Sequence, residues 1–426
     1  MIIRLHNRRP GFVVIGVLMV SLVIGFMLAA YLDLVSAQHQ SIARSQTWNT
    51  CIPVVEAGVE EALAHLHQTK GTNLTSNSWY PSQNGCLKWR TVGSGSALVV
   101  ISNGLTPVIY STAYMKAPLN GDYIRRTIKV ETRRDGIFSK GMVAKGQITL
   151  NGNQINVDSF DSQDPNYSTN GLYTPSKRKA NGDVATNSGL VNALAAGNAN
   201  IYGHVSTGPG GSVGIGNNGA VGDLAWQASG SSGIQPGYFS DDMNVAFPDV
   251  SPPFSGGFTP GNATGYQYVI SSSGDYRIPS LTGNLLVKSN VQARLIIDTE
   301  INMTGQDTIT IQKGASLNLY MAGPSAKITG NGVVNHSGNA TNFFYWGTPA
   351  NTTLTINGNG AFTGVIYAPH ASYTMNGGGN STLENMTGAS VTKTVQMNGN
   401  VNFHYDENLG RINLHRGFIV TSWKEI

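Results

Sequence analysis

The chain has 426 residues, a length that suits two or three domains, and only 12% of its residues are charged. Its formal net charge is +4, and this falls to +1 when the three arginines of residues 1–11 are left out. The net charge of the rest of the chain therefore does not indicate nucleic-acid binding. Short runs of valine, isoleucine and leucine recur through a sequence with 52 glycines, which predicts a mainly β protein rather than a disordered one.

The first predicted element is an apolar helix over residues 12–32, which carry no charge. At about 1.5 Å per residue, a helix of this length covers roughly the 30 Å of a hydrocarbon core. Arg4, Arg8 and Arg9 precede it, and this excess of positive charge favours a cytoplasmic N-terminus with the bulk of the chain on the far side. A cleavable secretory signal has a shorter apolar region of about 7–15 residues and fits less well, whereas a plain membrane anchor fits equally well.

The junction Arg8-Arg9-Pro10-Gly11-Phe12 distinguishes this segment from a plain anchor. It resembles the type IV prepilin family, in which a peptidase cuts after the glycine and methylates the new N-terminal residue. The resemblance implies processing between Gly11 and Phe12, a bacterial cytoplasmic membrane, and other pilin-like subunits as partners. Pilins usually carry glutamate at the fifth mature position, where this chain has Gly16. The resemblance therefore implies a minor or tip-like subunit and leaves entry into a filament open.

A helix is predicted to continue beyond the membrane, because residues 54–66 place apolar side chains at helical spacing. Within it, the segment from Glu56 to Ala62 resembles the corresponding segment of PilX-type minor pilins, and its glutamates are expected on a solvated face. The chain has two cysteines, Cys51 and Cys86. In an exported chain they are best interpreted as one disulfide, with two free thiols as the alternative.

A small sheet is predicted next, from strand-like runs at Ala97–Ser102, Val108–Lys116 and Tyr123–Arg134. By resemblance, a long helix packed on an antiparallel sheet is the usual pilin stem. The last run carries the only concentrated basic patch, which is expected to be a solvated sheet face; an anionic partner such as DNA or a polysaccharide is the alternative. The residues of this patch are Arg125, Arg126, Lys129, Arg133 and Arg134.

From Gly141 the sequence changes to short β-rich runs that end in Asn-Gly or Gly-Asn, at intervals of 19 to 28 residues between Gly283 and Gly399. Asparagine and glycine tolerate positive φ and suit tight corners. A strand and a corner about every twenty residues predict a right-handed parallel β-helix (a β-solenoid), with a β-sandwich as the competing architecture. Stacked asparagines at the corners are expected to form hydrogen-bonded ladders.

The segment from Gly358 to Glu407 resembles an uncharacterised β-helix domain that bacteria attach to PilX-type anchors, and Gly141–Ser162 resembles the first coil of that domain. The proline-rich residues 235–262 are predicted to form a loop over the surface, and residues 412–424 a last strand that caps the domain or returns to the stem. The expected domains are a leader at 1–11, a transmembrane and stem helix at 12–70, a small antiparallel sheet at 71–140, the β-helix at 141–410 and a terminal strand at 411–426.

Two sets of polar residues are candidates for a metal-binding or catalytic site. His404, Asp406 and Glu407 form the densest cluster, which suggests either closure of the final coil or a metal or acid–base site. The second group, Asp158, Asp161 and Asp164, suggests calcium ligands or glycan-cleaving carboxylates, although no regular spacing supports either role.

No phosphate-binding loop, zinc spacing or nucleophile elbow occurs in the sequence, so we expect no catalytic residue, no metal and no cofactor. The sequence predicts a membrane-anchored, PilX-like minor pilin or pseudopilin that displays an extracytoplasmic β-helix and acts in surface assembly or adhesion. A surface glycan or a cell contact is the expected partner class, and no specific nucleic acid is expected. The alternative is a membrane-anchored, carbohydrate-active β-helix enzyme.

Overall fold

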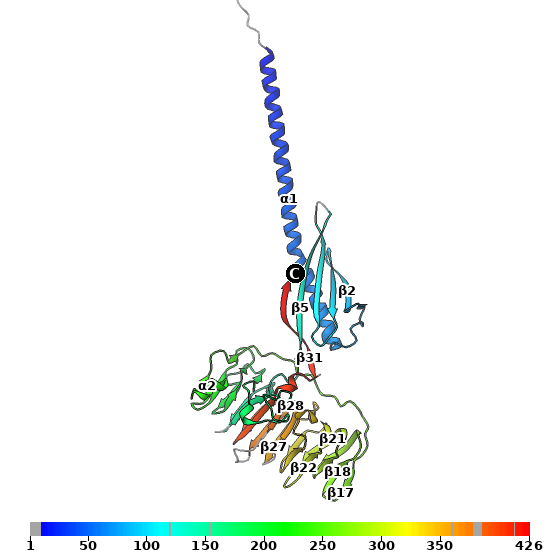
Figure 1. The fold of residues 1–426 in the computed structure, drawn as a ribbon, viewed down its shortest axis with the longest axis vertical. Helices are drawn as coiled ribbons and strands as arrows, with labels where there is room; N and C mark the ends of the chain where they lie inside the picture. Colours follow the sequence, from blue (N-terminus) through cyan, green and yellow to red (C-terminus); the bar gives the residue numbers. More distant parts are fainter. Residues whose placement is uncertain (1–9, 119–120, 153–154, 359–361, 378–385, 413) are drawn as a thin grey trace, which may run out of the picture. The chain divides into compact units, whose positions relative to one another are not determined.

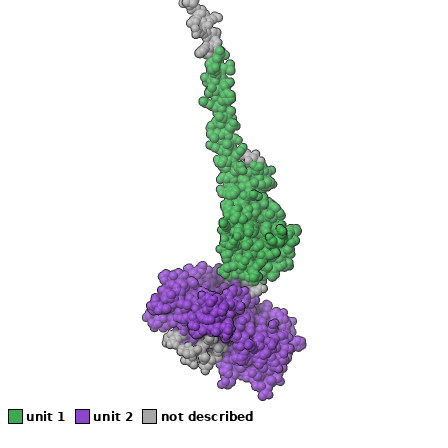
Figure 2. All heavy atoms as spheres, viewed as in Figure 1, with its two compact units in different colours: residues 1–135, 416–426 green, residues 136–415 purple. Residues whose placement is uncertain are grey.

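The structure is a computed structural model that describes residues 10–118, 121–152, 155–358, 362–377, 386–412 and 414–426. It divides into two compact units (Figure 2). Unit 1 contains residues 1–135 and 416–426, and unit 2 contains residues 136–415. Most of the predicted leader, residues 1–9, lies outside the described part. The division into two units does not test the other predicted domain boundaries, which remain predictions.

Helix α1 (Pro10–Thr69) is continuous, and its two halves have different surroundings (Figure 1). Every side chain from Val13 to Leu34 is exposed, and the helix is long and apolar enough to cross a membrane. Exposing an apolar surface of this size to water is unfavourable, so the first half suits a single-pass anchor. The second half buries Val55, Val59 and Ala62, which share one helical face, in the core of unit 1.

Unit 1 packs this second half on a six-stranded sheet in which β1 to β5 pair in antiparallel order. The predicted runs are confirmed as β3, β4 and β5, and the predicted return of the last strand to the stem is confirmed as β31. The close approach of α1 to β4 depends on Gly58, because a Cβ at this position would lie 2.4 Å from Ser111 Oγ. The strands are β1 (Tyr80–Ser82), β2 (Gly85–Val92), β3 (Gly95–Ser102), β4 (Val108–Lys116), β5 (Tyr123–Gly136) and β31 (His415–Glu425).

The predicted disulfide is absent, because Cys51 and Cys86 are both free and buried. Cys51 Sγ lies 3.9 Å from the carbonyl of Ile124, near the start of β5. Cys86 is in register with Ile101 on β3, and that row continues through Ile109 to Val130, six residues further along β5. The two thiols therefore lie toward opposite ends of the sheet, whereas a disulfide requires Cα atoms within about 7 Å.

Unit 2 consists of short strands that pair mainly in parallel within one 25-stranded sheet. Before the loop that starts at Asp241 the strands are β6 (Met142–Ala144), β7 (Ile148–Asn151), β8 (Ile155–Phe160), β9 (Val184–Thr186), β10 (Leu194–Gly197), β11 (Asn200–Tyr202), β12 (Val205–Ser206), β13 (Val213–Ile215), β14 (Ala220–Gly222), β15 (Gly233–Ile234) and β16 (Phe239–Ser240), with η1 (Pro175–Lys177) and α2 (Leu224–Ala228) among them.

After that loop come an antiparallel pair, β17 and β18, and a second series of mainly parallel strands. They are β17 (Gly261–Ala263), β18 (Tyr266–Ile270), β19 (Gly274–Leu281), β20 (Leu285–Val287), β21 (Gln292–Asn302), β22 (Thr308–Ile311), β23 (Ser316–Met321), β24 (Ser325–Ile328), β25 (Gly332–Asn335), β26 (Phe343–Gly347), β27 (Thr353–Gly358), β28 (Phe362–Gly377), β29 (Met386–Asn398) and β30 (Val401–Asp406), with η2 (Ala340–Asn342) and η3 (Glu407–Gly410).

The strands stack so that in-register apolar side chains form one continuous core, as in Leu295, Leu319 and Tyr345 on successive strands. The predicted asparagine ladders are confirmed. Asn398 Nδ2 donates to Asn376 Oδ1 at 2.7 Å, and Asn376 donates in turn to Asn357. These asparagines lie at the ends of the paired strands β27, β28 and β29, where such ladders satisfy polar side chains and help to fix the register.

The stacking order does not follow the order of the chain. One row runs through β19, β21, β23, β26, β28 and β29, and then continues into β6, β9, β12 and β16. The strands nearest the end of unit 2 thus pair with those at its beginning, as β29 does with β6 and β7, and β30 with β8.

The predicted fold class, a right-handed parallel β-helix, is therefore wrong. A β-helix advances coil by coil along the chain, whereas this sheet joins its last strands to its first and ends in an antiparallel pair. The periodic corners reveal the length of each turn of chain, but they carry no information about which turns stack together. The mainly β composition and the long N-terminal apolar helix are confirmed.

Because β16 and β17 lie at opposite ends of the stack, the segment between them must cross it (Figure 1). We call this segment, residues 241–260, the strap. Met243 N donates to the carbonyl of Thr207 near one end, Tyr367 Oη donates to the carbonyl of Pro248 in the middle, and Phe258 N donates to the carbonyl of Asp275 near the other. The predicted surface loop over residues 235–262 is confirmed for residues 241–260, while β16 and the start of β17 occupy parts of its two ends.

Candidate functional site

The two groups of polar residues singled out in the sequence meet where the last strands join the first. β30 pairs in parallel with β8, which places His404 opposite Asp158 and Asp406 opposite Phe160. We call the resulting set the junction cluster. It contains Asp158, Asp161, Tyr173, Lys179, His404, Asp406, Glu407 and Arg411.

His404 and Asp158 form the buried centre of the junction cluster. His404 Nδ1 lies 2.6 Å from Asp158 Oδ1, and the two residues are 5% and 1% exposed. Tyr173 Oη donates to Asp158 Oδ2 at 2.8 Å, and its ring stacks on the imidazole at a centroid distance of 3.6 Å. Both carboxylate oxygens are therefore occupied, and the stacked tyrosine covers one face of the imidazole.

Asp161 makes a bidentate ion pair within the junction cluster. Arg411 donates to its two oxygens through Nη1 at 2.8 Å and Nη2 at 2.5 Å, a bidentate geometry. The Arg411 guanidinium lowers the pKa of Asp161 despite the opposing effect of burial. Asp164 lies outside this pair and closes a turn instead, where its Oδ1 accepts from Asn166 N at 2.9 Å.

Asp406 and Glu407 are also bound by neighbouring groups. Asp406 Oδ1 accepts from Ser162 N and Asn408 N, each at 3.1 Å, and thereby caps η3; burial raises the pKa of this carboxyl. Glu407 pairs with Lys179 and accepts from the hydroxyl of Ser159 at 2.9 Å. His404, Asp406 and Glu407 therefore make these contacts mainly with residues from the start of unit 2, and Asp406 also with η3.

This geometry favours the structural interpretation that the sequence offered, closure of the final coil. Within the described residues, no group of three or more histidines, cysteines and carboxylates is placed to hold a metal ion. Sequence reasoning missed Tyr173, Lys179 and Arg411, which lie in a long loop and beyond η3. No spacing in the sequence indicates such partners, because they depend on the pairing of β8 with β30.

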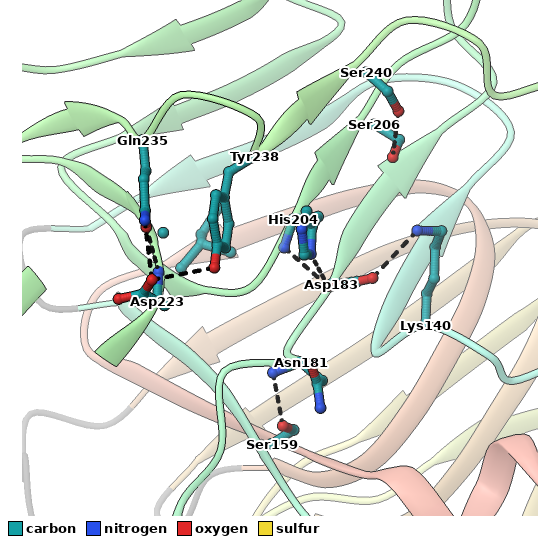
Figure 3. A network of polar contacts seen from close by, with 12 residues as sticks. Lys140, Ser159, Asn181, Asp183, His204, Ser206, Asp223, Gln235, Tyr238 and Ser240 are labelled. Atoms are coloured by element: carbon teal, nitrogen blue, oxygen red, sulfur yellow. Dashed lines mark hydrogen bonds and ion pairs between the residues drawn. The ribbon is translucent and has the colours of Figure 1, made fainter. Parts of the chain in front are cut away.

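A second set of polar residues, which we call the corner network, lies in the turns that precede β6, β9, β12 and β16 in the chain and beside β14 and β15 (Figure 3). It contains Lys140, Asp183, His204, Asp223, Gln235 and Tyr238. Asp183 Oδ2 lies 3.3 Å from Lys140 Nζ, and its Oδ1 accepts from the backbone amide of His204 at 2.8 Å. The ring of His204 stacks on Tyr238 at 4.3 Å, and Tyr238 donates to Asp223. About half of the His204 side chain is exposed.

The corner network holds successive turns of chain together at the surface. Asp223 accepts from Trp226 N at 2.7 Å and from Gln235 Nε2 at 2.9 Å, and these donors lower the pKa of its carboxyl. One signal in the sequence bears on this network, because Asp183 and His204 are separated by roughly one turn of chain. This spacing indicates a contact only once it is known that β9 pairs with β12.

The remaining predicted residues lie in unit 1. Gly11 and Phe12 fall in the first turn of α1, and the side chain of Phe12 is outside the described residues. The basic patch lies on β5, as predicted, but part of it is neutralised: Arg126 makes a bidentate pair with Glu425 at 2.6 and 2.7 Å, and Lys129 pairs with Glu131 at 2.6 Å. Arg125 and Arg133 are exposed.

Residues 268–412, about a third of the chain, match a family described as "Domain of unknown function (DUF7305)". No curated protein matches the chain. Among solved structures, the competence-associated pilin ComZ from Thermus thermophilus aligns with 10% sequence identity and a TM-score of 0.26, over 89% of this chain and 98% of that one. A TM-score at this level supports no conclusion about the fold.

Proposed function

We propose that this protein is a membrane-anchored, pilin-like minor subunit that presents unit 2 outside the cytoplasm for surface assembly or adhesion. One observation carries the proposal: α1 is a single helix whose apolar first half is fully exposed and whose second half packs on an antiparallel sheet. The exposed half needs lipid or neighbouring apolar helices around it, and the packed half fixes the folded units to that anchor.

Three features of the sequence support the pilin-like part of the proposal. The junction at Gly11 and Phe12 resembles that of a prepilin, and the segment from Glu56 to Ala62 resembles that of a PilX-type stem. Gly16 carries no carboxylate for a neighbouring amine, and a Cβ added at this position would meet nothing within 4 Å. The missing carboxylate favours a minor subunit over one that builds a filament, because a buried carboxylate in lipid persists only when it is paired.

The mass of the native N-terminus tests the proposal. We expect a chain that begins with N-methyl-Phe12, and we expect Gly11→Val to leave the leader attached because a bulky side chain enters the cleavage site. Gly25→Val is the matched control, since it places the same residue in the same helix, at a position where a Cβ also meets nothing within 4 Å. A native chain that still begins at Met1 would refute prepilin processing.

For unit 2 we propose a structural rather than a catalytic role. The alternative enzyme needs carboxylates free to act on a glycan, whereas Asp158 and Asp161 are each held by two donor contacts or more. A reducing-end assay on the purified chain with β-linked glycans checks this. Cleavage that disappears in both Asp158→Asn and Asp161→Asn would overturn the structural proposal.

A further inference from the structure

A small groove crosses three paired strands on the outer surface of unit 2. In register, Asp275 on β19 lies opposite Arg294 on β21, which lies opposite Asn318 on β23 and then Phe344 on β26. The groove has a volume of about 340 Å³. Its polar lining residues are Ser273, Asp275, Gln292, Arg294, Ser316 and Asn318.

The polar groups of this groove point outward and retain hydrogen-bonding capacity. Arg294 Nε and Nη2 donate to the two oxygens of Asp275 at 2.6 and 2.7 Å, and this leaves other guanidinium hydrogens for a ligand. Asn318 Oδ1 accepts from Trp346 Nε1 at 3.1 Å, so its amide NH₂ remains available. The side chains of Gln292 and Ser316 make no hydrogen bond to any other described residue.

Flat aromatic rings border the groove on the side of β26. Phe344 and Trp346 stack at a centroid distance of 5.5 Å with 8° between their planes, and Trp346 stacks on Tyr320 at 6.3 Å and 13°. Phe254 of the strap adds an edge-on contact with Tyr320 and lies under the Arg294 guanidinium at 5.3 Å. These aromatic side chains are only half-buried, so part of each surface reaches solvent.

The charge and the hydrogen-bonding groups of the groove indicate which class of ligand it can bind. Because Asp275 already neutralises Arg294, the groove has no surplus positive charge to attract a polyanion. A carboxylate, amide groups and a guanidinium beside flat rings match a sugar, which offers hydroxyls at its edge and C–H groups on its face. Paired strands repeat at about 4.8 Å, and an extended β-linked glycan advances by a similar distance per sugar.

We propose that this groove binds a neutral, extended glycan, with its hydroxyls on the Asp275–Arg294–Asn318 row and a sugar face against Trp346 and Phe344. The inference adds a ligand class to the proposed display of unit 2, but binding by the purified chain does not depend on prepilin processing. The N-terminal mass and the binding measurement can therefore fail separately.

A larger groove of about 830 Å³ is less suited to the same ligand. It is lined by stacked corners that include Ser289, Lys313 and Asn342. Several of its polar groups are satisfied internally: Ser289 Oγ donates to Gln312 Oε1 at 3.2 Å, and Asn342 Nδ2 donates to Ser337 Oγ at 2.8 Å. This groove provides the control for the experiment.

The test is titration of the full-length chain, in a sugar-free zwitterionic detergent, with cellohexaose, chitohexaose, maltohexaose and laminarihexaose. Polygalacturonate is the anionic comparison, and tryptophan fluorescence and calorimetry are the readouts. We expect saturable binding of at least one neutral hexasaccharide, weakened about tenfold by Arg294→Ala or Asn318→Ala. Gln292→Ala should also weaken binding, and it leaves the fold intact because this exposed side chain has no partner among the described residues. Lys313→Ala, in the larger groove, should change nothing.

Three results would overturn the proposal. The first is no binding of any neutral hexasaccharide by the folded chain. The second is binding that survives Gln292→Ala and Asn318→Ala unchanged, because the ligand would then lie elsewhere. The third is binding of polygalacturonate alone with an affinity that falls as salt is added, which would indicate an electrostatic site.

Discussion

Cys51 and Cys86 share one apolar core but have no contact with each other. Burial raises the pKa of both thiols, and that of Cys86 to about 11. A thiol in an unfolded chain has a pKa of about 8.5. The folded chain therefore keeps its Cys86 proton between about pH 8.5 and 11, where the unfolded chain releases it. The contribution of this thiol to stability is complete below pH 8.5 and is lost as the pH rises toward 11.

Alkylation without reductant tests the state of these cysteines. We expect iodoacetamide to leave the native chain almost unmodified at pH 8, because only the thiolate reacts and both thiols are buried. After denaturation, still without reductant, we expect two added groups in the intact mass. Modification of the native chain should rise between pH 9 and 11. A chain that accepts no group until a reductant is added contains the disulfide and contradicts the structure.

Single residues were predictable where their chemistry is local. His404, Asp406 and Glu407 stand together in the sequence, so this polar cluster could be singled out without knowledge of any partner. Arg411 as the partner of Asp161 could not be predicted, because the two are 250 residues apart and the pair depends on β8 lying beside β30. Charge pairs across a sheet become visible only after the strand pairing is fixed.

At the scale of elements, the strap has a physical reason to cross the stack. The in-register row of Tyr320, Trp346 and Tyr367 faces outward from the core, and it continues through Val391 to Val143. An outward apolar row of this length would be costly in water. In this row Tyr367, Val391 and Val143 are buried, whereas Tyr320 and Trp346 remain half-buried. Phe254 of the strap contacts Tyr320 edge-on, and Lys145 lies over the ring of Phe247 at 5.9 Å.

Removing one hydroxyl should loosen the strap. Tyr367→Phe deletes the 2.8 Å hydrogen bond to the carbonyl of Pro248, which we expect to lower the free energy of unfolding by about 1 kcal/mol. Amide exchange of a peptide that spans Met243 and Val245 should accelerate in this variant, because their amides bond to Thr207 and Asn187 only while the strap is seated. Exchange is read by mass spectrometry of the full chain.

Tyr373→Phe is the matched control, since this hydroxyl is buried against two methionine sulfurs and does not bond to the strap. It should leave strap exchange unchanged. Equal exchange in Tyr367→Phe and the wild-type chain would show that the strap is held by its apolar side chains alone.

Strand positions were accessible from the sequence and strand partners were not. Val108–Lys116 is β4 with the bounds that were predicted, and Asn290 takes the positive φ of 61° expected of an asparagine corner. Turns of similar length and similar apolar pattern can stack on one another in any order, however. The pairing of β29 with β6 is set by tertiary packing, which explains why a chain-ordered β-helix was predicted.

At the scale of the whole chain, unit 2 is formed by two series of strands joined in two ways. The strap joins them covalently, and the ladders of β29 and β30 with β6, β7 and β8 join them by backbone hydrogen bonds. The junction cluster adds the His404–Asp158 contact and the Arg411–Asp161 pair. The second connection contains part of the apolar core, since its strands bury Met142, Val157 and Phe403 completely.

A cut in the strap should therefore leave unit 2 assembled. A protease site inserted after Gly256, where a Cβ meets nothing within 4 Å, divides the chain into residues 1–256 and 257–426. We expect both pieces to elute together in size-exclusion chromatography and to separate only in denaturant. Because β31 also belongs to the sheet of unit 1, the same cut is made in a second chain that stops at His415. Association in this shorter chain then reports the junction of β29 and β30 with β6 to β8, together with the contacts that Pro248 and Phe254 of the strap make with Tyr367 and Tyr320. Separation of its pieces in native buffer would mean that the strap, rather than the paired strands, holds the two series together.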